Sequence, residues 1–144
     1  MRSRAPLALM EQMIMLLVFA LAAALCLQAF AKSDRMSKQS EARDRAVTLC
    51  QSVAETVRSN GSNFNTSAEQ LGLEFGQGST MFRYYDENWE PVSGLEGAAY
   101  CLSVNGLYDT PDGLGKASVS VSEAEGETLF ALEVAWQEEV PAHG

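Results

Sequence analysis

The stretch that decides the fold is residues 7–31, which read LALMEQMIMLLVFALAAALCLQAFA. It holds one charged residue, Glu11, and every side chain from Met13 to Leu27 is apolar. A helix rises about 1.5 Å per residue, so roughly 20 residues cross a hydrocarbon core about 30 Å thick. A backbone in lipid must satisfy its own hydrogen bonds, which favours a helix. We therefore predict a transmembrane helix over residues 7–31.

A short basic segment, residues 1–6 (MRSRAP), precedes this stretch. Its two arginines, Arg2 and Arg4, favour retention of the N-terminus in the cytoplasm while the apolar stretch inserts. The expected arrangement is a single-pass membrane protein with a cytoplasmic N-terminus and an extracellular C-terminal domain.

The helix is predicted to continue through residues 32–59, which contain neither Gly nor Pro. Apolar residues recur there at steps of three and four, which places them on one face of a helix: Ala46, Val47, Cys50, Val53, Ala54 and Val57. Asn60 and Gly61 then supply a stop signal. We expect the apolar face of this amphipathic continuation to pack against a sheet.

The rest of the chain indicates a small antiparallel sheet. Residues 60–78 are predicted to be a polar linker with one short helical stretch, 67–71, and residues 79–137 a sheet domain. Five strands are expected, at 81–85, 89–92, 98–104, 117–122 and 128–137. Apolar and polar residues alternate in the last two, which is typical of a sheet with one buried and one solvated face. Residues 138–144 look like a disordered tail, and the predicted fold class is α+β.

The charge distribution argues against nucleic-acid binding. The chain carries a net charge of −9 at pH 7. From residue 60 onward, only Arg83 and Lys116 stand against the aspartates and glutamates of this half. Binding to phosphates requires Lys and Arg side chains that displace counterions. A nucleic-acid partner is therefore not expected.

The three cysteines, Cys26, Cys50 and Cys101, leave two alternatives open. Cys50 and Cys101 could form a disulfide in an extracellular domain. If Tyr100 and Leu102 face the helix, however, Cys101 faces away from it, and the bridge would require a bulge. The alternative is that both thiols are free.

Metal binding and catalysis have little support in the sequence. The cysteines and the single histidine, His143, lack the spacing of a zinc site. Asp109 and Asp112 are weak candidates for cation ligands, because they share a loop but lack the ligand spacing of a calcium loop. No nucleophile–base pair can be assembled around the histidine, so we expect neither an enzyme nor a cofactor.

The segment Leu7-Ala8-Leu9-Met10-Glu11, followed by the apolar run to Ala31, resembles the N-terminus of type IV pilins and pseudopilins. That family has a glutamate at the fifth mature position, so Glu11 implies Leu7 as the first. The resemblance implies that Glu11 pairs with the free amine of Leu7 in a neighbouring subunit. It further implies a structural subunit of a pilus-like filament or a type II secretion-like apparatus, whose partners are other pilin-like subunits and the membrane.

Processing is the point at which the sequence departs from this family. A prepilin peptidase would cut between Pro6 and Leu7, but the family leader normally ends in glycine. Small residues at Ala29 and Ala31 also fit cleavage by a signal peptidase before Lys32. A permanent anchor is the third alternative. The runner-up function is therefore a secreted or membrane-anchored extracellular binding module.

Overall fold

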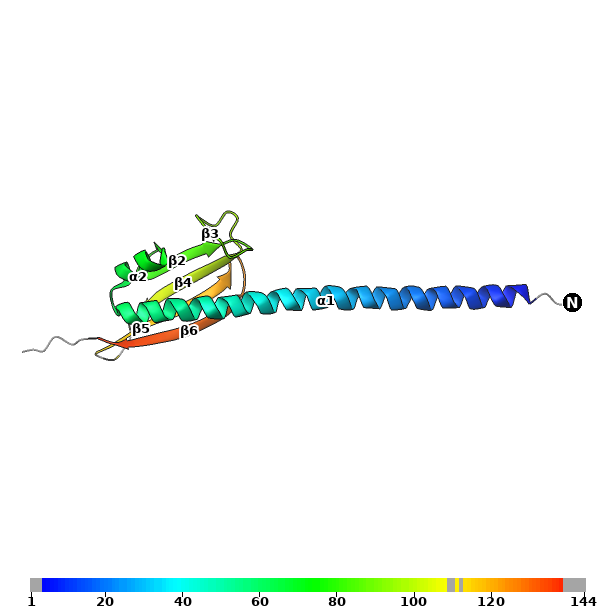
Figure 1. The fold of residues 1–144 in the computed structure, drawn as a ribbon, viewed down its shortest axis with the longest axis horizontal. Coiled ribbons are helices and arrows are strands. Elements are labelled where there is room, and N and C mark those ends of the chain that lie inside the picture. Colours follow the sequence, from blue (N-terminus) through cyan, green and yellow to red (C-terminus); the bar gives the residue numbers. More distant parts are fainter. Residues whose placement is uncertain (1–3, 109–110, 112, 139–144) are drawn as a thin grey trace, which may run out of the picture. The chain divides into compact units, whose positions relative to one another are not determined.

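A computed structural model describes residues 4–108, 111 and 113–138. It confirms the α+β prediction, because a long N-terminal helix is followed by a small antiparallel sheet on which its C-terminal part packs (Figure 1). The chain divides into two compact units, residues 1–41 and 42–144. The first unit is helical from Ala5 onward, and the second contains the end of the same helix and every strand of the described residues.

Helix α1 (Ala5–Asn60) extends over 56 residues. Leu, Ala and Met are strong helix formers, and no glycine interrupts the element. Pro6 lies in the first turn, where its missing N–H has no helical acceptor to lose. Gly61 follows Asn60 with a φ of 59°, a left-handed conformation that glycine adopts at low cost and that ends the helix. The predicted leader therefore overlaps α1, which begins two residues before position 7.

The sheet is antiparallel throughout, with the strand order β1-β2-β4-β5-β6 and β3 paired to β2. The long strands β2, β4, β5 and β6 are neighbours in this order, with β6 at one edge of the sheet. Strands β1 and β3 have two residues each. The strand bounds are β1 (Glu74–Phe75), β2 (Thr80–Tyr85), β3 (Pro91–Val92), β4 (Tyr100–Leu107), β5 (Leu114–Glu123) and β6 (Thr128–Gln137).

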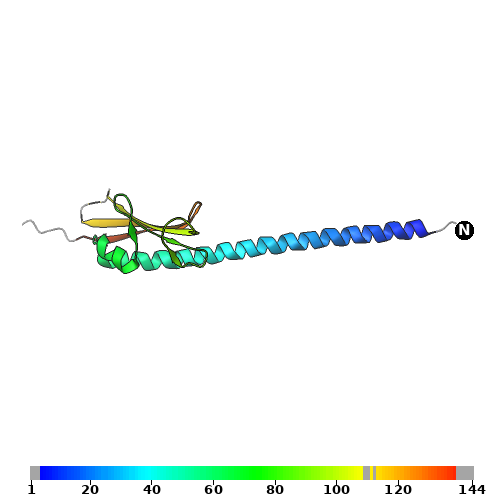
Figure 2. The same ribbon diagram turned by 90° about the horizontal axis from the view of Figure 1, so that it is seen from above.

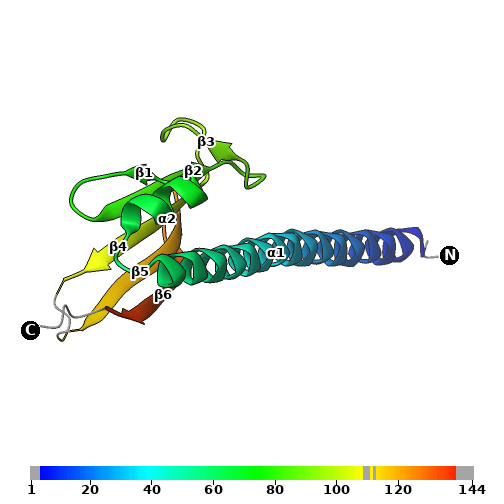
Figure 3. The same ribbon diagram turned by 60° about the vertical axis from the view of Figure 1, so that its left-hand side comes forward.

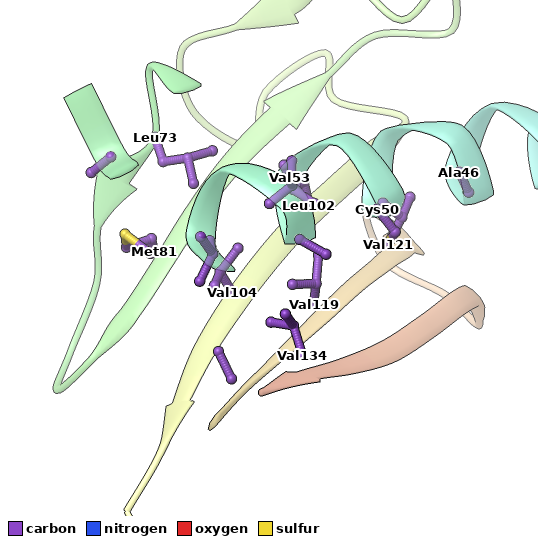
Figure 4. Packing of buried hydrophobic residues seen from close by; sticks show 14 of the residues in the cluster. Ala46, Cys50, Val53, Leu73, Met81, Leu102, Val104, Val119, Val121 and Val134 are labelled. Atoms are coloured by element: carbon purple, nitrogen blue, oxygen red, sulfur yellow. The ribbon is translucent and has the colours of Figure 1, made fainter. Parts of the chain in front are cut away.

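One face of the sheet is covered by helix in the second unit (Figure 2). The predicted stripe on α1 forms the helical side of the core, with Cys50 and Val57 fully buried and Val47 only partly. The sheet contributes the alternate residues of its central strands, which meet the stripe in Figure 4: Met81, Leu102, Val104, Val119, Val121 and Val134. Burying such a side chain contributes about 1.5–3 kcal/mol, so this contact holds the second unit together.

The expected linker at 60–78 is largely folded. It contains α2 (Phe64–Leu71), which starts earlier than predicted because the Asn63 side chain caps it, accepting the N–H of Thr66 at 3.2 Å. At its other end Arg83 Nη1 donates to the Leu71 carbonyl at 2.7 Å. This distant cation satisfies a helix-terminal acceptor, a contact that local sequence patterns do not indicate.

The turn between β2 and β3 places a large side chain in an uncommon backbone conformation. Trp89 has a φ of 66°, where glycine is usual. Its ring stacks on Tyr100 with centroids 4.2 Å apart and an interplanar angle of 13°. The Asp86 side chain accepts the N–H groups of Asn88 and Glu90, which fixes the turn. We infer that the stacking and the capped turn offset the backbone strain.

Strands β4 and β5 run further than the sequence indicated. Residues 105–115 were expected to be a loop, but β4 reaches Leu107 and β5 starts at Leu114. The two glycines concerned act as small residues within strands. Gly106 pairs with Ala117, and Gly115 pairs with Trp136.

We predict that Gly115→Ala destabilises the second unit, because the added methyl group would lie closer than 3.0 Å to the Trp136 indole. Overpacking of this kind costs about 1–3 kcal/mol. The effect is measured as a lower midpoint of thermal unfolding. Gly76→Ala is the matched control, since its new methyl would approach no atom more closely than the Phe82 ring, at 3.3 Å. Equal midpoints for the two variants would contradict the packing described here.

Candidate functional site

The first candidate site is the exposed apolar part of α1. Its large side chains have no partner surface among the described residues: Leu7 is 70% exposed, Phe19 74% and Phe30 80%. By length and composition this is one helix able to cross a membrane. A signal sequence near an N-terminus has the same properties, so this helix does not distinguish a membrane anchor from a cleaved signal.

Glu11 is the single acidic residue within the apolar stretch. It follows Leu7 by four residues in α1, so the two side chains share one face of the helix. Within residues 4–108, 111 and 113–138, no cation forms an ion pair with Glu11. An unpaired carboxylate at the centre of a membrane costs about 2.5–3.5 kcal/mol on insertion scales, and less near its edge. A partner cation from outside the described chain would remove that cost.

Both candidate cleavage sites lie within α1. Pro6 and Leu7 are in its first turn, and Ala29 and Ala31 are in its middle, exposed on the helix surface. The buried residues of α1 begin only at Ala42. Cleavage at either site therefore leaves the helical side of the core intact.

The cysteines are free thiols in the structure. Cys50 is fully buried on the helix face of the sheet, next to Val121. Cys101 points to the opposite face, because the neighbouring Leu102 belongs to the core and successive strand residues alternate. The sheet itself therefore separates the two thiols, and the disulfide considered from the sequence is not formed.

Burial sets the chemistry of these two thiols. It raises the pKa of Cys50 to about 11, and a weaker opposing effect comes from a hydrogen bond with the Val121 backbone. Burial also raises the pKa of Cys101. The reactive species of a cysteine is the thiolate, so neither side chain is activated as a nucleophile at neutral pH.

The candidate cation ligands Asp109 and Asp112 lie outside the described residues. Within the part of the chain that the structure describes, no group of three or more His, Cys, Asp or Glu residues is placed to hold a metal ion.

The outer face of the sheet is rich in hydroxyl groups along β4 and β5. Ser103 and Ser120 share a hydrogen bond of 2.9 Å across β4 and β5, and Thr80 donates to Asn105 Oδ1 at 2.8 Å. The predicted alternation of β5 is confirmed, with Ala117, Val119 and Val121 buried and the serines between them half-buried. The hydrogen bond from Arg83 to the Leu71 carbonyl was not predicted, because it depends on the tertiary fold.

Comparisons of the chain with protein-family models, with curated proteins and with solved structures found no match.

We predict that Cys101 reacts with an alkylating reagent at least about tenfold faster than Cys50, because Cys50 is fully enclosed and its thiolate is disfavoured. Reaction at Cys50 should accelerate as the pH rises toward about 11. Peptide mass spectrometry of the Cys26→Ala chain in detergent measures both rates without interference from the third thiol. A Cys50–Cys101 disulfide in the unreduced digest would contradict the structure.

Proposed function

We propose that this chain is a membrane-anchored structural subunit of a filament or apparatus of the type IV pilus or type II secretion kind. The observation that carries the proposal is the division of one helix between two roles. Residues of α1 before Ala42 are exposed and mostly apolar up to Ala31, whereas the stripe from Ala42 to Val57 is buried in the core of the sheet domain.

The apolar part of α1 supports the proposal because its exposed surface is unfavourable in water and must be buried in lipid or against another protein. Its side chains offer no polar surface to water over residues 13–27. Contiguous apolar surface of this extent marks a membrane or protein interaction site. Lipid would cover it in a single subunit, and the α1 helices of neighbouring subunits would cover it in a filament.

Glu11 supplies the proposed register between subunits. A carboxylate in an apolar environment is tolerated when a fixed cation lies beside it. Cleavage before Leu7 would create such a cation, the free amine of Leu7, one helical turn away from Glu11 along the chain. In the proposed assembly, the Glu11 carboxylate of one subunit forms an ion pair with the protonated Leu7 amine of its neighbour. This pairing sets the offset between neighbouring subunits along the filament axis.

A second candidate function is a secreted binding module that begins at Lys32. The observation that favours it is that the core of the second unit includes no residue before Ala42. A chain cut after Ala31 would lose the membrane segment and Glu11 but would keep the whole core. Such a product would be recovered from the medium rather than from membranes.

We predict that Glu11→Gln, which removes the charge and keeps the shape, lowers the fraction of subunits in sedimentable polymer at least about tenfold in the native host. Breaking one partner of a buried ion pair costs about 3–5 kcal/mol, which is sufficient for a loss of this size. The polymer sheared from cells is quantified against the total chain in membranes.

Glu55→Gln is the matched control, because Glu55 is an exposed glutamate of the same helix but lies in the second unit. It should leave the polymer fraction unchanged. Wild-type levels of polymer with Glu11→Gln would show that the carboxylate does not set the register.

A further inference from the structure

Strand β6 (Thr128–Gln137) is a long edge of the sheet, and no strand pairs with its outer side in the described part of the chain (Figure 3). Its inner side pairs with β5 along the whole strand. The outer-face residues Ala131, Glu133 and Ala135 are exposed. A free edge of this length presents a row of unpaired backbone groups.

The hydrogen-bonding pattern identifies which residues carry those free groups. Glu138 donates its N–H to the Gly113 carbonyl at 3.0 Å, in register with the β5–β6 ladder. In an antiparallel pair, alternate residues bond to the partner strand, so even-numbered residues of β6 from 130 onward bond to β5. The N–H and C=O groups of Ala131, Glu133 and Ala135 therefore point away from the sheet.

The opposite edge of the sheet is blunted, and β6 is not. Strands β1 and β3 are two residues long, and β3 begins with Pro91, whose nitrogen cannot donate. In β6 there is no proline or lysine, and its one register shift, opposite Val121 and Ser122, lies at its start. Short strands, proline, lysine and bulges are the usual protection of edges. The middle of β6 has none of these four features, and Glu133 is its one charged side chain.

We propose that the free edge of β6 binds an extended segment of a different polypeptide by antiparallel strand addition, with lysine or arginine on one side of that segment and apolar residues on the other. The charged side is set by Glu133, which sits at the middle of the outer face on the edge strand, whereas the nearest cation in the register, Lys116, lies on β5 opposite Ala135 and so on the far side of β6 from the added segment. The apolar side is set by Phe130 and Leu132, which are only partly buried on the helix face. Opposite charges across a strand pair stabilise it.

A second copy of this chain fits the edge poorly. In the second unit α1 and β6 run in the same direction, because Cys50 lies by Val121 near the start of β6, and a methyl group added at Gly61 would contact the Trp136 ring near the end of β6. Antiparallel pairing of two β6 strands would point their α1 helices in opposite directions, whereas two subunits anchored in one membrane, as in the proposed function, need the same direction. The paired strands would also bring together two acidic halves.

The experiment uses the full chain in a neutral detergent with a capped synthetic peptide of about ten residues that alternates lysine and valine. Amide hydrogen exchange is followed by NMR. The expected result is slower exchange at Ala131, Glu133 and Ala135 when the peptide is added. Ala135→Pro removes an outward N–H without removing a bond to β5, so the chain should stay folded and bind the peptide at least about tenfold more weakly. Ala135→Val, which keeps the N–H and adds comparable bulk, should bind normally.

Three results would overturn the proposal. Equal binding by Ala135→Pro and Ala135→Val would show that the backbone edge is not used. Equal binding of a peptide that alternates glutamate and valine would remove the role of Glu133. If exchange at the same amides slows as the chain concentration rises without peptide, a second copy of the chain occupies the edge. The polymer assay with Glu11→Gln is independent of all three results, so failure of one proposal is distinguishable from failure of the other.

Discussion

The contact between the α1 stripe and the sheet is the interaction on which the rest of the structure depends. Among the described residues, every large apolar side chain that is fully buried belongs either to α1 between Cys50 and Val57 or to the strands opposite. A two-layer arrangement of one helix stripe on one sheet face is the smallest way to enclose such a core. It also leaves the other sheet face and both sheet edges exposed, and the hydroxyl-rich face and the free edge of β6 lie there.

The same helix carries two sequence patterns that solve different physical problems. Over residues 13–27 it is apolar all around, which suits lipid or other helices. From Ala42 onward only one stripe is apolar, and the exposed side carries charged residues such as Arg43 and Glu55. Between these two patterns, Asp34 and Lys38 form an exposed ion pair at 3.0 Å, which contributes little to stability. The change of pattern along α1 is the basis for assigning the two parts different roles.

The elements that could be predicted from the sequence are those specified by local residue patterns. The stripe on α1 and the alternation in β5 follow from periodicity, and both are confirmed. The helical stretch predicted at 67–71 lies within α2, but its first turn was not predicted, and distant groups also stabilise this helix. Phe64 packs edge-on against Trp136, with ring centroids 5.9 Å apart, and Arg83 binds the end of α2. A loop was also predicted where the strands continue through Gly106 and Gly115, since glycine is read locally as a turn signal.

The candidate sites also divide into those that local sequence predicts and those that depend on the tertiary fold. Glu11 and Leu7 are assigned from sequence alone, and their proposed roles rest on a partner that lies outside this chain. The separation of Cys50 and Cys101 by the sheet followed from alternation once Leu102 was placed in the core. The free edge of β6 was not predicted, because strand order depends on which distant strands pair, and no local pattern contains that information.

The central claim is that the apolar part of α1 stays with the mature protein and carries its assembly. The most direct test is the intact mass and N-terminal sequence of the chain recovered from the membranes of its host. The account predicts a chain that begins at Leu7 and retains Glu11. A chain that begins at Lys32 would lack the apolar helix and contradict the account. A chain that begins at Met1 would leave Leu7 without a free amine and contradict the pairing on which the proposed assembly depends.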